Sequence, residues 1–170
     1  MTEDRPNKVP WPPLIYGAAA GAAWVLGRWV PLGFLPVLSL TGLTIIATGL
    51  GFDIAAMVTM VRHRANILPH RAATALVSTG PFAVSRNPIY LGNTLVLVGL
   101  AGALGNAWFL LAAVAAARVV TTLAILREEA HLAGRFGAAW DDYAARVPRW
   151  FGLPTNRHMG TSAIGGKDRK

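Results

Sequence analysis

Two polar clusters, each next to an apolar segment of membrane length, contain most of the side chains that could take part in chemistry. The first runs from Leu76 to Tyr90 and ends in Arg86-Asn87-Pro88-Ile89-Tyr90, immediately before an apolar segment. The second runs from Arg127 to Trp150, immediately after another apolar segment, and contains the paired acids Glu128 and Glu129. A carboxylate at a membrane–water boundary can bind a cationic or hydroxyl-rich ligand. We therefore expect the two clusters to form one site at the same membrane face.

A purely structural role would also explain parts of each cluster. Glu128 could form weak surface ion pairs with Arg127 or Arg135 on a solvated helical turn. The Asn87-Pro88 pair is a typical helix start, with asparagine as the N-cap and proline in the first turn. Tyr90 could belong to the aromatic belt of a membrane helix. These structural interpretations and the functional one both remain open at the level of sequence.

Two further ionisable residues, Asp53 and Arg118, lie inside apolar segments. A charge at that depth costs several kcal/mol, by order of magnitude, unless it is paired or faces a cavity. The two residues are therefore expected either to be functional or to pair with each other. They support an alternative interpretation, in which the chain is a small four-span transporter or a non-catalytic membrane protein.

A metal site is not predicted. The sequence contains no cysteine, which excludes thiolate ligands, disulfides and a cysteine nucleophile. Glu128-x-x-His131 matches half of the helical di-iron pattern, but that pattern requires a second Glu-x-x-His and further carboxylates in the bundle. The apolar segments offer only Asp53.

The elements that must position these residues are membrane helices. Hydrophobic residues make up 54% of the 170 residues and charged residues only 14%, against about 25% charged in soluble domains. A helix needs about 20 apolar residues to cross the hydrocarbon core. We predict an all-α polytopic membrane protein whose four spans, paired in two hairpins, cover residues 14–30, 35–61, 88–104 and 107–126.

The positive charge of the chain predicts its orientation in the membrane. The formal net charge is +8, and nearly all lysines and arginines precede the first span, separate the second from the third, or follow the fourth. This asymmetry places both termini and the site loops in the cytoplasm of a bacterial-type inner or cell membrane. Attraction of these basic residues to anionic lipid also accounts for the basic composition. No nucleic-acid partner is therefore predicted.

Beyond the fourth span the helical pattern continues into water. Leu132, Phe136, Trp140 and Tyr143 recur at helical spacing, which predicts a C-terminal cytoplasmic amphipathic helix. Residues 1–153 are expected to form a single domain and residues 154–170 a disordered basic tail. Small residues at Gly17 with Gly21, and at Gly99 with Gly102, predict close packing between helices.

Taken together, the two clusters resemble the isoprenylcysteine carboxyl methyltransferase family and its bacterial relatives, which include phospholipid methyltransferases. The residues that carry the resemblance are Thr74-Ala75-Leu76-Val77, Gly80-Pro81-Phe82, Arg86-Asn87-Pro88-Ile89-Tyr90, Glu128-Glu129, Phe136-Gly137, Tyr143 and Arg146-Val147-Pro148. The resemblance implies an integral-membrane methyltransferase that uses S-adenosyl-L-methionine, enclosed by the last helices and their flanking loops.

The resemblance also implies roles for single residues. The positions expected to contact the cofactor are Thr74, Ala75, Leu76, Val77, Phe82, Asn87, Pro88, Ile89, Tyr90 and Glu128. We further expect four residues to bind the substrate or support the site, namely Arg86, Arg118, Glu129 and Arg146. No residue is assigned to acid–base catalysis, because methyl transfer to a nucleophilic acceptor depends mainly on alignment and on exclusion of water.

The expected partner is membrane lipid together with a lipophilic small-molecule or prenylated substrate. The acceptor itself stays open between an isoprenylcysteine carboxylate or prenylated thioether peptide, a phospholipid amine, a small thiol and a quinone-like lipid. A sterol-reductase-like enzyme with a nicotinamide cofactor is a further alternative, although the sequence has no evident phosphate-binding glycine-rich loop.

Overall fold

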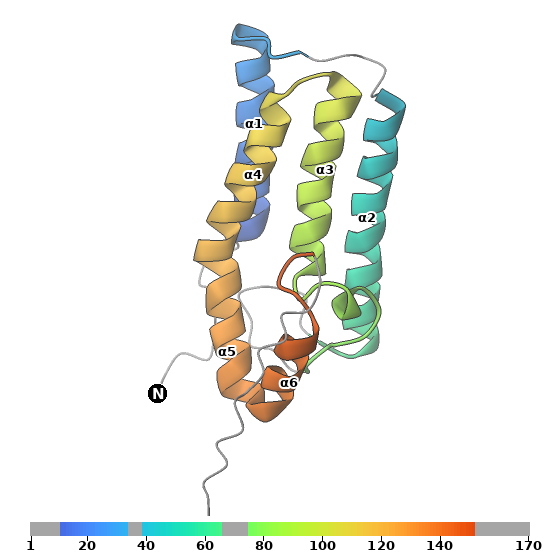
Figure 1. Ribbon diagram of the computed structural model, residues 1–170, viewed down its shortest axis with the longest axis vertical. Helices are drawn as coiled ribbons and strands as arrows, with labels where there is room; N and C mark the ends of the chain where they lie inside the picture. The colour runs from blue at the N-terminus through green and yellow to red at the C-terminus, as the bar shows by residue number, and fades with distance from the viewer. Residues whose placement is uncertain (1–10, 34–38, 66–74, 152–170) are drawn as a thin grey trace, which may run out of the picture.

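The computed structural model describes residues 11–33, 39–65 and 75–151, and over these residues the chain is helical apart from its connections and one isolated β-bridge (Figure 1). The long helices are α1 (Trp11–Trp29), α2 (Ser39–Arg62), α3 (Pro88–Leu104) and α4 (Trp108–Val120). A π-helical turn, η3 (Thr121–Ile125), joins α4 to α5 (Leu126–Phe136), and α6 (Ala138–Arg146) follows. A short 3-10 helix, η2 (Gly80–Ala83), precedes α3. The all-α prediction is confirmed.

Two of the helices are long and apolar enough to cross a membrane. They are α2 and the continuous helix from Trp108 to Phe136, whereas α3 is apolar but shorter. Helix α3 has the same bounds as the third predicted span, and α1 begins three residues before the first one, at Trp11-Pro12-Pro13. The fourth helix extends ten residues beyond its predicted end. Four membrane crossings therefore remain a prediction.

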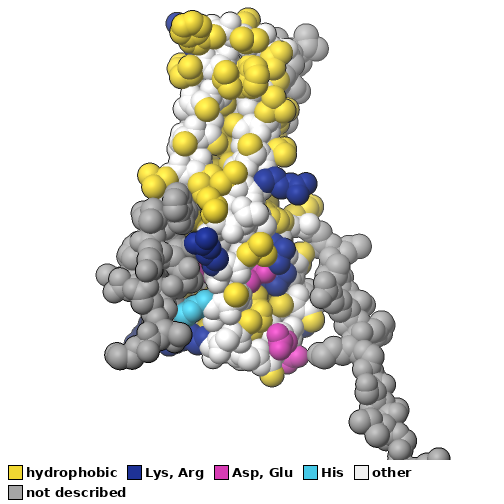
Figure 2. All heavy atoms as spheres, turned by 90° about the vertical axis from the view of Figure 1, so that its left-hand side faces the viewer, with side chains coloured by type: hydrophobic (Ala, Val, Ile, Leu, Met, Phe, Trp, Pro, Cys, Tyr) yellow, Lys and Arg dark blue, Asp and Glu magenta, His cyan; other side chains and the backbone are white. Residues whose placement is uncertain are grey.

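The four long helices run side by side (Figure 1). Helices α5 and α6 and the loop that precedes α3 lie together at one end of the bundle. Large hydrophobic side chains such as Trp29, Leu40 and Val114 are exposed on the outside of the bundle. On the face that Figure 2 presents, hydrophobic side chains cover the upper part, while most charged side chains lie toward the end that holds α5 and α6. This distribution fits a bundle surrounded by lipid.

Helices α2 and α3 pack backbone to backbone through four glycines. Gly42 and Gly49 on α2 face Gly99 and Gly92 on α3, and the two glycines of each helix are seven positions apart. A Cβ on Gly49 would lie 2.6 Å from the Gly92 carbonyl oxygen, and a Cβ on Gly99 would lie 2.7 Å from that of Gly42. Since a real Cβ does not approach so closely, these positions require glycine.

The predicted role of Gly99 in helix packing is thus confirmed, but that of Gly17 and Gly21 is wrong. A Cβ at either of these two positions would meet nothing within 4 Å. Helix α1 instead packs against α4 through a core that contains Tyr16, Ala23 and several residues of α4.

Replacing Gly99 with alanine is expected to lower the stability of the bundle. Overpacking costs about 1–3 kcal/mol, which corresponds to a fall in Tm of roughly 3–10 °C for a chain of this length. Gly17→Ala is the matched control, because it adds the same methyl group where space is open. Thermal unfolding of both variants in detergent tests this, and equal Tm values would contradict the packing interpretation.

The C-terminal segment forms two helices, α5 and α6, where the sequence predicted a single amphipathic helix. Gly137 adopts a left-handed φ of 50° and separates α5 from α6. The residues that suggested one helix still meet, because α6 folds back and buries Trp140 and Tyr143 against Leu132 and Phe136. The turn thereby brings the chain after α6 toward the loop before α3.

Candidate active site

The loop before α3 and the chain at the end of α6 are held together by hydrogen bonds. The Tyr143 hydroxyl donates to the Phe82 carbonyl oxygen over 2.8 Å, and the Arg86 amide donates to the Pro148 carbonyl oxygen over 2.9 Å. Burial of Tyr143 raises the pKa of its hydroxyl, so this donor keeps its proton at neutral pH. The two polar clusters of the sequence therefore meet in space.

Asn87 and Ser85 strengthen this connection. Ser85 is fully buried, accepts the Asn87 amide over 3.1 Å and donates to the Arg149 carbonyl oxygen over 3.2 Å. The Asn87 side chain donates to the same carbonyl over 3.0 Å. Asn87 occupies the N-cap position of α3 but makes no capping hydrogen bond with its side chain. The prediction of a capping side chain is therefore wrong, because the amide fastens the chain after α6 instead.

Glu129 joins two arginines beneath the loop. Its carboxylate accepts hydrogen bonds from Arg149 Nε over 3.0 Å and from Arg149 Nη2 over 2.6 Å, and Arg86 Nη1 lies 3.6 Å away. The Arg86 guanidinium also lies over the Trp140 ring, 5.6 Å from its centroid, a favourable cation–π distance. The ion pairs that the structure shows at the paired acids are those of Glu129 with Arg149 and Arg86.

These contacts change the protonation equilibria of both arginines. The hydrogen bonds to Glu129 raise the pKa of the Arg149 guanidinium. Burial lowers the pKa of Arg86, although the carboxylate of Glu129 opposes this shift. Both groups remain cationic because arginine is effectively always protonated in proteins. Glu129 thus balances two positive charges at a largely buried position, where its side chain is 12% exposed.

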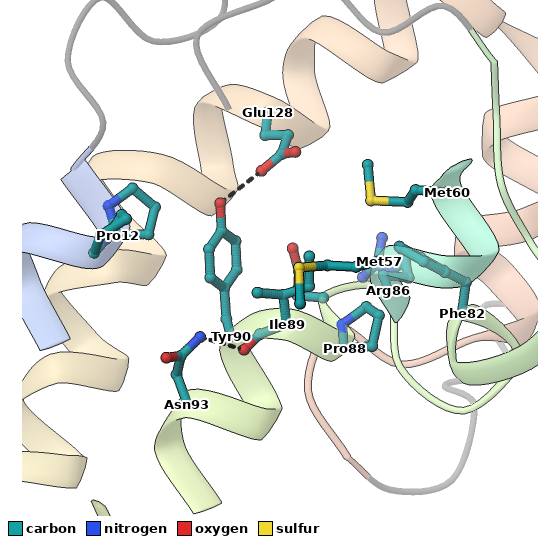
Figure 3. A pocket seen from close by; sticks show the side chains of 12 residues that line it. Pro12, Met57, Met60, Phe82, Arg86, Pro88, Ile89, Tyr90, Asn93 and Glu128 are labelled. Carbon is teal, nitrogen blue, oxygen red and sulfur yellow. Dashed lines mark hydrogen bonds between the residues drawn. The ribbon is translucent and has the colours of Figure 1, made fainter. Parts of the chain in front are cut away.

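Glu128 points in a different direction from Glu129, toward Tyr90 of α3. Neighbouring residues of a helix differ in direction by about 100°, so the paired acids have separate surroundings. The Tyr90 hydroxyl donates to Glu128 Oε2 over 3.1 Å, and both side chains line a pocket of about 300 Å³ (Figure 3). Six of the ten residues predicted to contact a cofactor line this pocket: Phe82, Asn87, Pro88, Ile89, Tyr90 and Glu128.

The other predicted cofactor-contacting residues lie elsewhere. Thr74 lies outside the described residues. Ala75, Leu76 and Val77 do not line the pocket: Val77 is buried, and Leu76 packs against the cluster of Trp140 and Tyr143. Leu76 and Val77 therefore contribute to packing and do not line the pocket.

The four residues expected to bind substrate or support the site do not all lie at the pocket. Arg86 lines the pocket. Glu129 does not line it but contacts both Arg86 and Arg149. Arg146 is exposed and donates to the Asp142 carbonyl oxygen of its own helix, away from the pocket. Arg118 is exposed on α4 and lines a different groove, of about 480 Å³, between α3 and α4.

Asp53 and Arg118 do not pair with each other, so their interpretation as an internal ion pair is wrong. Asp53 lies on α2, where its carboxylate approaches the backbone of Gly92 on α3. Its Oδ1 atom is buried and has no hydrogen-bond partner in the part of the chain that the structure describes.

Sequence reasoning missed the pocket residues of the first two helices and one residue of α3. These residues are Pro12, Pro13, Met57, Met60 and Asn93. Asn93 had a detectable signal, because it is an amide in an apolar helix and follows Ile89 and Tyr90 by one turn, on the same face. The prolines and methionines have no such signal, since only the packing of the bundle brings them to the site.

A π-helical turn precedes Glu128. It covers Thr121–Ile125, and the Trp150 indole donates to the Thr121 hydroxyl over 3.2 Å. A π turn inserts an extra residue and rotates everything that follows it, and such turns occur frequently at functional sites. The turn therefore helps to set the direction in which Glu128 faces.

The chemistry open to this site is that of a carboxylate in an apolar, helix-lined pocket. Among the described residues no three histidine, aspartate or glutamate side chains are grouped to hold a metal ion. The polar lining consists of Glu128, the Tyr90 hydroxyl, Arg86 and two asparagines. Such a lining suits a ligand with a large apolar part and a few cationic or hydroxyl groups.

Comparisons with known proteins agree with this description. A model of the family described as "Phospholipid methyltransferase" matches residues 37–139, more than half of the chain. The nickel-cobalt-cadmium resistance protein NccN of Alcaligenes xylosoxydans xylosoxydans is 41% identical over 81 residues, which are 48% of this chain and 38% of that protein. This chain therefore spans well under half the length of that relative. No solved structure matches. The match confirms the resemblance found in the sequence, and the chain belongs to the phospholipid methyltransferase family.

Proposed function

We propose that this chain is an S-adenosylmethionine-dependent methyltransferase that acts on a lipophilic acceptor in the membrane. The observation that carries the proposal is the meeting of Tyr90 and Glu128, from the two separate sequence clusters, at one pocket. Family membership supports methyl transfer in general. The apolar helices and exposed hydrophobic side chains support a membrane setting.

The pocket residues fit this cofactor. S-adenosylmethionine carries a sulfonium cation, an amino-acid end and an adenosine end, and it supplies an activated methyl group. Glu128 would bind its ammonium group or its ribose hydroxyls, and Phe82 would pack against a flat apolar surface such as adenine. Arg86 would attract its carboxylate. The pocket volume of about 300 Å³ is at the lower end of the usual range for small-molecule sites.

The chain's own residues would act by alignment. Tyr90 orients Glu128 by a hydrogen bond, and Met57, Met60 and Phe82 would exclude water from the reacting groups. Holding two reactants in the correct geometry can lower a barrier by several kcal/mol, roughly 7–11 in favourable cases. An acid–base triad is not required for transfer from a sulfonium to a nucleophile.

Two measurements on detergent-purified protein test the proposal. Calorimetry is expected to detect binding of S-adenosylmethionine. Incubation with the methyl-labelled cofactor and a lipid extract is expected to yield a labelled lipid, which mass spectrometry then identifies. Protein that neither binds the cofactor nor labels any lipid would overturn the proposed function.

We also propose that the chain crosses the membrane four times, with the site end in the cytoplasm. The absence of cysteine from the sequence makes single-cysteine labelling a clean test. Leu32→Cys is at an exposed position near the far end of the bundle, and Ala139→Cys is at an exposed position on α6. A membrane-impermeant maleimide added outside intact cells is expected to label only Leu32→Cys, and both variants once the cells are permeabilised. Labelling of Ala139→Cys in intact cells would reverse the orientation.

A further inference from the structure

The groove between α3 and α4 shares no lining residue with the pocket that contains Glu128. Its volume of about 480 Å³ is within the usual range for small-molecule sites. Helix α4 runs toward the end of the bundle that holds α5 and α6, and α3 runs away from that end (Figure 1). The groove is therefore a second candidate site, separate from the proposed methyl-transfer pocket.

The lining of the groove changes from apolar to polar along its length. On α4, Leu110 and Val114 precede Arg118 by eight and four residues, so the three lie on one helix face, with the arginine nearest to α5. On α3, Val98 follows Thr94 by four residues, which places the threonine nearer to that same end. One end of the groove is thus apolar, and the other carries hydroxyl and guanidinium groups.

The chain after α6 completes the polar end of the groove. Arg149 and Trp150 line it, and the Trp150 indole donates to the Thr121 hydroxyl of the π turn over 3.2 Å. Tryptophan is enriched at the membrane–water interface, which is the depth of phospholipid headgroups. A ligand at this end would therefore contact both the fourth helix and the segment that fastens the loop before α3.

The polar end of the groove has an excess of positive charge. Arg118 is exposed, and none of the ion pairs between described residues includes it. The single carboxylate of Glu129 contacts both Arg149 and Arg86, so it does not balance both charges. In the described structure no acidic side chain lines the groove. An arginine inside an apolar segment is costly unless it is paired or faces a polar site, so the charges favour an anionic ligand and the apolar end favours one with a hydrocarbon chain.

We propose that this groove binds an anionic phospholipid, with its phosphate between Arg118 and Arg149 and an acyl chain along the apolar end. Basic pockets between membrane helices bind such headgroups, and a guanidinium group suits phosphate because it can donate two parallel hydrogen bonds. The lipid is a ligand that joins α4 to the chain after α6 and is not a methyl acceptor, since neither Glu128 nor Tyr90 lines the groove. Its binding requires neither methyl transfer nor S-adenosylmethionine.

Native mass spectrometry of the full chain in detergent tests the site with two lipids, dioleoyl phosphatidylglycerol and dioleoyl phosphatidylcholine. The acyl chains are the same, but only phosphatidylglycerol has a net negative charge, and the parent is expected to retain it better. Arg118→Gln removes the charge of one arginine and is expected to weaken phosphatidylglycerol binding about fivefold, equivalent to about 1 kcal/mol. Binding of phosphatidylcholine is expected to stay unchanged.

Two further variants and a soluble probe serve as controls. Arg127→Gln removes the same charge from an exposed position nine residues further along the chain that does not line the groove, and it should retain phosphatidylglycerol like the parent. Arg118→Lys restores the charge and should recover most of the binding. Glycerol 3-phosphate has the phosphate but no acyl chain, and it is expected not to be retained.

Thermal unfolding in detergent provides a second readout. A ligand that binds only the folded chain stabilises it, so phosphatidylglycerol is expected to raise the Tm of the parent more than that of Arg118→Gln. Without lipid the two proteins are expected to have the same Tm, which shows that the variant is folded.

Three results would overturn the lipid site. The first is unchanged phosphatidylglycerol binding by Arg118→Gln. The second is an equal loss of binding in Arg118→Gln and Arg127→Gln, which would indicate general attraction to the basic end of the bundle. The third is retention of glycerol 3-phosphate as strong as that of phosphatidylglycerol, which would indicate a site for a soluble phosphate. Because no measurement uses S-adenosylmethionine, the lipid site and the proposed function can fail independently.

Discussion

Replacing Glu128 with alanine is expected to weaken S-adenosylmethionine binding by at least about tenfold. A hydrogen bond to a charged group contributes about 1.5–3 kcal/mol, and a tenfold change in affinity corresponds to 1.4 kcal/mol. Glu128 is the only carboxylate among the residues that line the pocket in the described structure. Isothermal titration calorimetry of the purified variant measures the effect.

Two further variants make the Glu128 result interpretable. Tyr90→Phe removes the 3.1 Å hydrogen bond to the carboxylate and keeps the ring, so a smaller loss of affinity is expected. Asp142→Ala removes an exposed carboxylate on α6 and should bind like the parent. If Glu128→Ala and Tyr90→Phe both bind the cofactor like the parent, the assignment of these residues to a cofactor site fails.

Replacing Glu129 with alanine is expected to affect stability rather than pocket chemistry. The substitution leaves Arg149 without its two hydrogen bonds and Arg86 without its neighbouring carboxylate. Because the Arg149 side chain is 38% exposed, water offsets part of the loss. We expect about 2–3 kcal/mol, which lowers Tm by roughly 5–10 °C.

A control variant and a double variant test whether the loss of stability comes from the contact between Glu129 and Arg149. Asp141→Ala removes an exposed acid and should change the free energy of unfolding by no more than about 0.5 kcal/mol. The double variant Glu129→Ala with Arg149→Ala should lose less than the sum of the two single variants, because the residues contact each other. Additive effects would show that the pair does not stabilise the connection between the loop and the chain after α6.

The sequence predicted the helices that depend on local signals. Pro88 marks the first residue of α3, and Gly105 adopts a left-handed φ at its end, so both bounds followed from residue type. The break at Gly137 was missed because the apolar spacing continues across it. The π turn at Thr121–Ile125 has no distinct residue pattern and depends on contacts such as that with Trp150.

The candidate site was predictable where its residues are adjacent in sequence. The segment Asn87–Tyr90 lies on the first turn of a helix whose start was evident, and it reaches the pocket as a unit. The sequence did not distinguish the different surroundings of Glu128 and Glu129, because those depend on which helix face meets α3. The contributions of Pro12 and Met57 arise only from tertiary packing, to which glycines on α2 and α3 contribute.

The hydrogen bonds from Ser85, Arg86 and Asn87 to the carbonyl groups of Pro148 and Arg149 impose an order on biosynthesis. The pocket-lining loop reaches its final fixed position only after the ribosome has released residue 149. A nascent chain that stops at the end of α5 contains every long helix but lacks the segment that fastens this loop. Ligand binding is thus expected to require translation beyond residue 149, whereas membrane insertion of the helices does not.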